Sequence, residues 1–214
     1  MGVDLPTILP MMFALVLGVV CHEWAHGYVA YRLGDATAYS EGRLTLNPIP
    51  HIDPFGTILM PMVLALTGAP VLFGYAKPVP VVFQNLRNPL RDMVYVAAAG
   101  PAMNLALAFG TTLVLSLVIN TLGVAGAAME SVGNLCVQTV RINVILAIFN
   151  LLPIPPLDGG RVAVGLLPHE AGRALANVEP YGFFIVFGLL LAGVLDVVIH
   201  PIMGAVLGVL QLLL

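Results

Sequence analysis

The distribution of apolar residues along this chain predicts a bundle of membrane helices. Four stretches are long enough for the roughly 20 residues that a spanning helix needs, and two others are less certain. The four are residues 6–31, 93–119, 130–152 and 180–199, and the others are 54–72 and 202–214. Asp53 and Pro54 give the 54–72 stretch a helix start of N-cap and first-turn proline. We therefore predict an all-α polytopic membrane protein with about five to six membrane helices.

Two segments between these stretches predict short extended elements. "SEGRLTLNPIPHID" alternates polar and apolar residues, and "FGYAKPVPVVF" carries prolines that exclude a regular helix but allow an edge strand. We expect the two segments to pair as a small re-entrant or interfacial β element at the membrane surface.

The composition supports a membrane protein and excludes several other classes. Of the 214 residues, 59% are hydrophobic and only 9% are charged, which is unlike a soluble domain. No basic run suggests a nucleic-acid partner. Cys21 and Cys136 lack Cys-x-x-Cys spacing, so they indicate neither a disulfide framework nor a thiolate zinc site. No long polar linker divides the chain, so residues 1–214 are expected to form a single domain embedded in the lipid bilayer.

The sequence "HEWAH" in the first apolar stretch predicts a metal site. On a helix, His22 and His26 project from one face one turn apart, so they can bind one zinc ion while Glu23 reaches a water molecule beside it. The alternative is two core histidines next to a chance glutamate. A membrane setting disfavours that alternative, because each ionisable residue at depth costs about 2 to 3 kcal/mol or more and needs a compensating partner.

A third ligand is expected, because catalytic zinc sites usually combine three protein ligands with water. Asp158 in "PIPPLDGGR" is the best candidate. Three prolines end the preceding helix, and Gly159 and Gly160 are expected to let the backbone turn sharply and aim the carboxylate into the bundle. The alternative for Asp158 is a surface Asp-Gly-Gly turn. We predict one Zn²⁺ per chain.

Two asparagines are further candidates for the site. Asn150 ends an apolar helix, where its amide can hold a peptide carbonyl or stabilise a developing oxyanion, so it is predicted to be both catalytic and substrate-binding. Asn104 in "AGPAMNLAL" lies inside another helix and is a candidate for substrate binding. The alternative for either residue is a hydrogen bond between helices, worth about 0.6 to 2 kcal/mol.

Counting membrane crossings constrains the topology. If residues 54–72 crossed fully, the two later helices would carry Asp158 to the face opposite the histidines. We therefore expect a re-entrant excursion that returns through "PVLFGYAKPVPV", which membranes tolerate where protein or a wet cavity covers the backbone. One side, predicted to be cytoplasmic, then carries most of the basic residues. These are Arg32, Arg43, Lys77, Arg87, Arg91, Arg161 and Arg173.

Several of these motifs together resemble a known family. "HEWAH", "GRLTLNPIPHIDPFGT", "FGYAKPVPV", "AGPAMN" and "NLLPIPPLDGGR" are similar to the site-2 protease family of intramembrane zinc metalloproteases, in its compact bacterial or archaeal form. The resemblance covers roughly residues 15–165. Many members carry a PDZ or CBS domain, and no segment here is long or polar enough for either.

The resemblance implies roles for the candidate residues. His22, His26 and Asp158 would be the zinc ligands, Glu23 the general base and acid, and Asn150 a substrate or oxyanion contact. The implied reaction is hydrolysis of a peptide bond within or next to a transmembrane helix of a protein substrate. The implied location is a prokaryotic cell membrane, with the active site opening towards the cytoplasm.

Two other functions place His and Asp residues in a bilayer. A divalent metal ion transporter would hold its ligands along a path and would not require Glu23 beside the histidine pair. A non-catalytic metal-binding membrane protein is the other alternative, although the presence of every expected polar residue argues against it.

Overall fold

The computed structural model describes residues 5–60, 62–63, 75–122 and 126–214, and in this part of the chain five helical segments are long and apolar enough to cross a membrane. The predicted all-α membrane architecture is thereby confirmed. Four of these segments lie in α1 (Leu5–Leu33), α4 (Pro89–Leu122), α5 (Ala127–Asn150) and α9 (Val194–Gln211). The fifth, 169–191, combines α7 (His169–Ala176), η4 (Glu179–Tyr181) and α8 (Gly182–Leu191).

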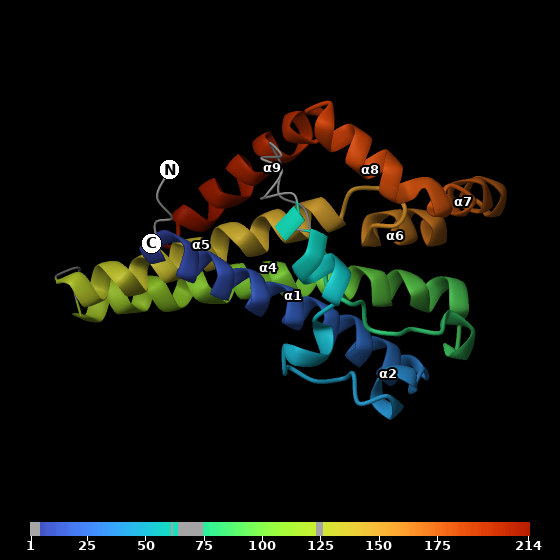
Figure 1. Cartoon of the computed structure of the whole chain (residues 1–214), viewed down its shortest axis with the longest axis horizontal. Helices are drawn as coiled ribbons and strands as arrows, with labels where there is room; N and C mark the ends of the chain where they lie inside the picture. Colours follow the sequence, from blue (N-terminus) through green and yellow to red (C-terminus); the bar gives the residue numbers. More distant parts are fainter. Residues whose placement is uncertain (1–4, 61, 64–74, 123–125) are drawn as a thin grey trace.

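Shorter helical turns lie between these segments. They are α2 (Thr37–Ser40), η1 (Ile49–His51), η2 (Pro54–Leu59), η3 (Phe83–Asn85) and α6 (Asp158–Leu166). In Figure 1, α2, α6 and α7 lie towards the same end as the last turns of α1 and the first turns of α4.

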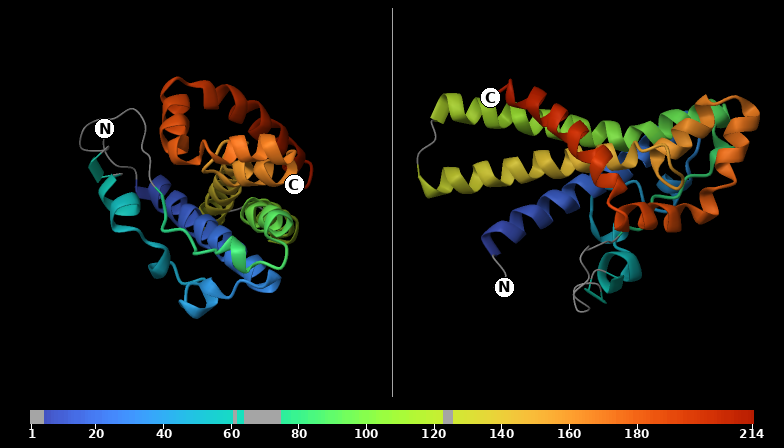
Figure 2. Two further views of the ribbon diagram at one scale, coloured as in Figure 1. Left: turned by 90° about the vertical axis from the view of Figure 1, so that its right-hand side faces the viewer. Right: turned by 90° about the horizontal axis from the view of Figure 1, so that it is seen from above.

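Helices α1, α4 and α5 pack against one another and form the centre of the bundle (Figures 1 and 2). Helix α9 packs on α5, where Val144 and Ile148 belong to the same buried apolar cluster as Leu195 and Ile199. A Cβ atom at Gly18 of α1 would lie 2.9 Å from Oδ1 of Asn143 in α5. Small residues at membrane-helix interfaces allow such a close approach, and it brings the polar groups of the three helices together.

The predicted boundary between the last two apolar stretches was wrong. The stretches 180–199 and 202–214 were expected as separate elements, but the chain breaks earlier, between α8 and α9. Gly193 adopts a left-handed conformation with φ of 69°, which ends α8 because other residues rarely adopt it. Helix α9 then continues through Pro201, which membrane helices tolerate.

The predicted pairing of two extended strands is not observed, since the described residues contain no strand. The guanidinium group of Arg43 takes the place of backbone pairing, because its Nη2 donates to the carbonyl oxygens of Lys77 (3.0 Å) and Pro78 (3.2 Å). The prolines in both segments explain the difference, since proline has no N–H to donate to a strand ladder.

The two ends of the predicted re-entrant segment meet. The backbone N–H of Lys77 donates to the carbonyl oxygen of His51 (2.9 Å), and that of Tyr75 donates to Gly56 (3.1 Å). Asp53 caps the start of η2 as predicted, since its Oδ1 accepts from the backbone N–H groups of the first turn. The chain therefore leaves and returns at one place. Most of the predicted 54–72 helix, residues 61 and 64–72, lies outside the described residues.

Asp35 anchors the far end of the extended segment 75–82, just after α1. Its Oδ2 accepts from the backbone N–H of Val82 (2.7 Å), and its Oδ1 accepts from the side-chain amide of Asn85 (3.1 Å). Burial alone would raise the pKa of Asp35, but hydrogen bonds from Thr37, Asn85 and Val82 outweigh burial and lower the pKa below its ordinary value. The carboxylate is therefore ionised at neutral pH and fixes the segment against the end of α1.

Candidate metal centre

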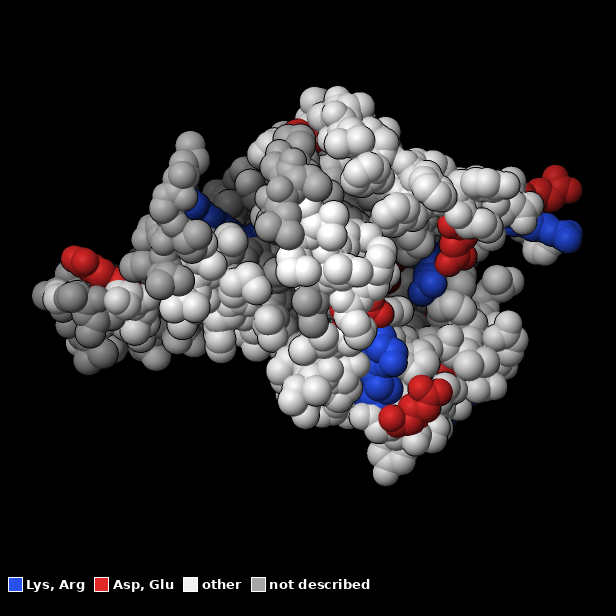
Figure 3. Space-filling view, viewed as in Figure 1, with Lys and Arg blue, Asp and Glu red and all other residues white. Residues whose placement is uncertain are grey.

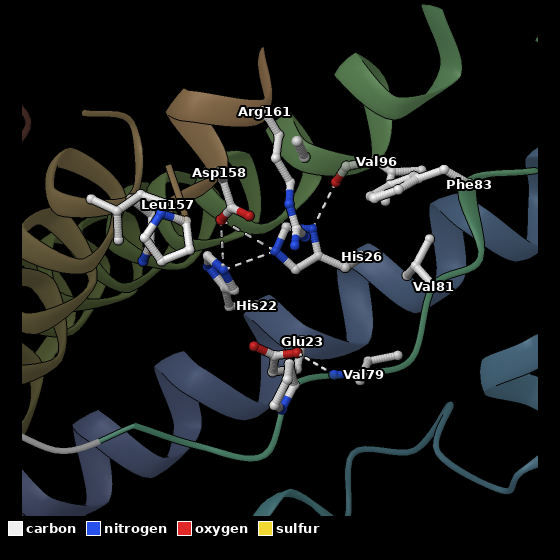
Figure 4. Close-up of a pocket in the computed structure, with 14 residues that line it drawn as sticks. His22, Glu23, His26, Val79, Val81, Phe83, Val96, Leu157, Asp158 and Arg161 are labelled. Carbon is white, nitrogen blue, oxygen red and sulfur yellow. Dashed lines mark hydrogen bonds and ion pairs between the residues drawn. The ribbon is translucent and has the colours of Figure 1, made fainter. Parts of the chain in front are cut away.

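Three buried side chains from two helices converge on one point. His22 and His26 project from the same face of α1, and their Nε2 atoms lie 2.9 Å apart. Asp158, the first residue of α6, places Oδ2 3.0 Å from Nε2 of His22 and 3.3 Å from Nε2 of His26. Figure 4 shows the two rings and the carboxylate pointing towards one another. The predicted ligand trio is thus brought together.

The other ring nitrogens determine which atoms face this point. Nδ1 of His26 lies 2.7 Å from the carbonyl oxygen of Val96, and Nδ1 of His22 lies 2.7 Å from Oδ1 of Asn104. A carbonyl oxygen can only accept, so Nδ1 is the protonated nitrogen of each neutral ring and Nε2 carries a lone pair. Two nitrogen lone pairs and a carboxylate oxygen therefore face one another.

This arrangement fits a metal cation. Oδ2 of Asp158 is buried and has no hydrogen-bond donor among the described residues, and a buried acceptor without a partner is costly. Two imidazole nitrogens and one carboxylate oxygen are the donor set of many catalytic zinc sites.

Gly100 of α4 provides the space in front of the histidines. A Cβ atom at this position would lie 2.5 Å from Nε2 of both His22 and His26. Any larger residue would therefore occupy the volume onto which the lone pairs open. Gly100 could not be singled out from the sequence, because this contact depends on how α4 packs on α1.

The glycines after Asp158 have a different role from the one predicted. Gly159 and Gly160 lie in the first turn of α6, and neither has a positive φ. A Cβ atom on Gly159 would lie 2.2 Å from the carbonyl oxygen of Leu151, and one on Gly160 would lie 2.4 Å from the backbone nitrogen of Pro155. The two glycines let α6 pack against the preceding loop, and this packing places the Asp158 carboxylate.

Glu23 lies beside the trio and is held by the extended segment 75–82. Its Oε2 accepts a hydrogen bond of 2.7 Å from the backbone N–H of Val79 (Figure 4). Glu23 and the three converging residues line a cavity of about 270 Å³. Val79, Val81 and Phe83 contribute another part of its wall.

The two predicted asparagines occupy different places. Asn150 lines the cavity, and its Nδ2 donates to the carbonyl oxygen of Leu146 within its own helix (2.9 Å). Asn104 is fully buried behind His22 and is not among the cavity-lining residues. Their predicted contacts with substrate remain predictions.

Arg161 was predicted only as one of the basic residues on one side, yet it also lines the cavity. It lies one helical turn after Asp158, its Nη2 lies 3.2 Å from Oε1 of Glu179, and its guanidinium group stacks over the ring of Phe83. The spacing from Asp158 on a helix is the signal that would have found it. Sequence reasoning also missed Asn143, which supports Asn104 as described below. Both asparagines could have been found by the same sign in the sequence, an amide side chain inside an apolar stretch.

The geometry defines a class of site, which is a buried metal centre within a bundle of membrane helices. Comparisons with known proteins agree with a metal centre. The family model described as Peptidase family M50 matches residues 115–193. YwhC of Bacillus subtilis is 39% identical over 197 residues, which cover 91% of this chain and 86% of that protein. Rip2 of Mycolicibacterium smegmatis is 33% identical over 181 residues, or 85% of this chain and 66% of that protein.

An archaeal relative extends the comparison. MJ0611 of Methanocaldococcus jannaschii is 30% identical over 151 residues, which cover 71% of this chain and 67% of that protein. All three relatives carry names that describe zinc metalloproteases. No solved structure matches the chain. The chain belongs to peptidase family M50, the site-2 protease family of zinc metalloproteases.

Replacing Gly100 with alanine should block the metal site without unfolding the bundle. We expect Gly100→Ala to lower zinc affinity by about ten- to a hundredfold, the range seen when the surroundings of metal ligands are disturbed. Gly110→Ala on the same helix is the matched control, because a Cβ atom there meets no atom of the described residues within 4 Å. Zinc affinity is measured on purified protein in detergent. Parental affinity in Gly100→Ala would contradict the assignment of this space to the metal.

Proposed function

We propose that the chain is an intramembrane zinc metalloprotease that hydrolyses a peptide bond within or next to a transmembrane helix of a membrane-protein substrate. The observation that carries this proposal is the convergence of two imidazole lone pairs and a carboxylate beside Glu23, at the wall of a cavity inside a bundle of apolar helices. The relatives named as zinc metalloproteases support zinc as the metal.

The three converging atoms would hold the ion. Nε2 of His22, Nε2 of His26 and Oδ2 of Asp158 make a three-ligand set, which in catalytic zinc sites leaves a fourth position for water or substrate. Zinc, when bound there, supplies a Lewis acid that polarises a carbonyl group and makes a water molecule more acidic.

Glu23 is proposed as the proton carrier. The Val79 N–H holds Oε2, so the carboxylate is fixed at the cavity wall and its other oxygen is the one assigned to the reaction. This oxygen takes a proton from the attacking water and later delivers it to the nitrogen of the departing amine. Asn150, whose side chain lines the same cavity, is proposed to donate its amide to the substrate carbonyl oxygen, where negative charge develops.

The extended segment 75–82 is proposed to hold the substrate. A helical substrate keeps its carbonyl groups in hydrogen bonds, so cleavage requires local unwinding. Arg43, Glu23 and Asp35 pin the segment to the protein, while Pro78, Val79 and Val81 line the cavity. An unwound substrate backbone can pair with such a segment, as in other cases of edge pairing.

The observations favour this proposal over the two alternatives. A transporter would need further metal ligands along a path, but the described residues form only one group of His, Cys, Asp and Glu side chains able to hold a metal ion. A non-catalytic metal protein would not require a carboxylate that lies beside the metal site and faces a cavity. Glu23 is such a carboxylate.

The proposed location is the cell membrane of a prokaryote, because relatives occur in bacteria and in an archaeon. The site is proposed to open towards the cytoplasm. Basic side chains gather mainly over the half of the molecule with α2, α6 and α7 (Figure 3), and such an excess marks the cytoplasmic side. The meeting of His51 and Lys77 supports a re-entrant path for the segment between them.

Glu23→Gln should separate catalysis from metal binding. Glutamine keeps the size of the side chain but cannot take a proton, so we expect zinc to be retained and cleavage to fall by about a hundredfold or more. His22→Ala and Asp158→Ala should lose both zinc and cleavage. The assay quantifies zinc in purified protein and detects products of a single-span substrate by mass spectrometry. Cleavage at the parental rate in Glu23→Gln would remove its catalytic role, and a transporter would cleave nothing.

Val79→Pro should weaken catalysis by removing one hydrogen bond from Glu23. A hydrogen bond to a charged group contributes about 1.5 to 3 kcal/mol, so we expect the rate to fall by roughly ten- to a hundredfold while zinc content is unchanged. Val79→Ala keeps the N–H and serves as the control for lost side-chain packing. Equal rates in the two variants would show that the Val79 N–H does not position Glu23.

The topology is tested by labelling single cysteines at positions 77 and 161. In a variant that lacks Cys21 and Cys136, both introduced cysteines should react with a membrane-impermeant reagent from the cytoplasmic side only. Labelling of the two positions from opposite sides would rule out a re-entrant path for the segment before Lys77.

A further inference from the structure

Two asparagines from neighbouring helices form a chain of hydrogen bonds behind His22. Asn104 of α4 and Asn143 of α5 are both fully buried. Nδ2 of Asn104 donates to the carbonyl oxygen of Gly18 (3.0 Å) and to Oδ1 of Asn143 (2.9 Å). Nδ2 of Asn143 in turn donates to the carbonyl oxygen of Thr139 (2.8 Å). Neither asparagine lines the cavity.

The backbone carbonyl groups at the ends of this chain fix its direction. Because the Thr139 oxygen can only accept, Asn143 must turn its nitrogen to it and its own oxygen to Asn104. Because the Gly18 oxygen can only accept, the nitrogen of Asn104 must face it, which leaves Oδ1 of Asn104 for His22. Both hydrogens of the Asn104 amide are then used.

The alternative orientation is unfavourable. Reversing the Asn104 amide would set its oxygen against two other acceptors, the Gly18 carbonyl and Oδ1 of Asn143, in a buried and weakly polar environment that penalises such contacts. The hydrogen of the neutral His22 ring is therefore held at Nδ1, 2.7 Å from Asn104, and the lone pair of Nε2 is aimed at the metal position.

We propose that Asn104 and Asn143 are positioning residues for the metal centre, and that Asn143 acts on His22 only through Asn104. This inference rests on the proposed function in taking zinc as the ion. The two histidines are held differently. His26 donates to the backbone carbonyl of Val96, which no side-chain replacement removes, whereas His22 depends on two side chains that can be replaced.

The experiment compares zinc affinity in three variants of the full chain in detergent. Asn104→Leu and Asn143→Leu remove the amides at similar volume. Thr112→Val is the matched control, since Thr112 is also a buried polar residue of α4, and its hydroxyl donates to the carbonyl oxygen of Ala108 within the same helix. Zinc affinity is measured by competition with a chromophoric chelator, and Co²⁺ loaded in place of zinc reports ligand geometry by its visible absorption.

We expect Asn104→Leu to lower zinc affinity by about ten- to a hundredfold, as loss of a partner behind a metal ligand does, and to change the Co²⁺ spectrum. Asn143→Leu should shift affinity in the same direction by a smaller factor. Thr112→Val should match the parent. The thermal midpoint of each variant shows whether it is folded. If Asn104→Leu does not fold, the zinc affinity of Asn143→Leu tests the proposal.

Two results would overturn the inference. One is parental zinc affinity and an unchanged Co²⁺ spectrum in folded Asn104→Leu or Asn143→Leu. The other is an equal loss in Thr112→Val, which would make the effect one of general packing. The readout does not involve hydrolysis, so a parent protein that binds zinc with the expected variant pattern but cleaves nothing would refute the protease and leave the positioning role standing. A parent that binds no zinc would refute both.

Discussion

The structure depends on three hydrogen-bond acceptors that face one another, with no donor between them in the described part of the chain. In a buried setting such a cluster is unfavourable unless a cation occupies the space between them. The surroundings nevertheless enforce it, because the Val96 carbonyl and the Asn104 amide each take the hydrogen of one histidine ring. The fold therefore holds an arrangement that a bound metal cation makes favourable, and this supports a metal centre over a polar core cluster.

Each of the packed helices contributes to this arrangement. Helix α1 supplies both histidines, α6 supplies Asp158, and α4 supplies the Val96 carbonyl, Asn104 and the open space at Gly100. Helix α5 supports Asn104 through Asn143 and comes close to α1 because Gly18 has no side chain. In membranes, helix association relies on close packing and interhelical hydrogen bonds, and here the same contacts that hold the bundle also orient the ligands.

Features that are local in the chain could be predicted from the sequence. Features that depend on packing between helices could not. The spacing of His22, Glu23 and His26 places them on a helix by its period alone, and counting crossings was enough to bring Asp158 to the same side. The space at Gly100 and the close packing of Gly159 could not be predicted, since both are set by groups that are distant in sequence or belong to another element. The expected strand pairing failed for a related reason. Alternation of residue types does not show whether backbone N–H groups are free to pair. Prolines prevent strand pairing between the two segments, and the Arg43 side chain bridges them instead.

The extended segment 75–82 links the proposed base to the proposed substrate contact. The Val79 N–H holds Glu23, and Val79 and Val81 also line the cavity into which an unwound substrate would extend. Side chains outside the segment hold it on either side of Val79 and Val81. Arg43 bonds to its start and Asp35 bonds to its end, so its position over α1 is set without substrate. A substrate backbone laid along it would therefore meet a carboxylate already in place, and little reorganisation of charge would be needed when the water proton is transferred.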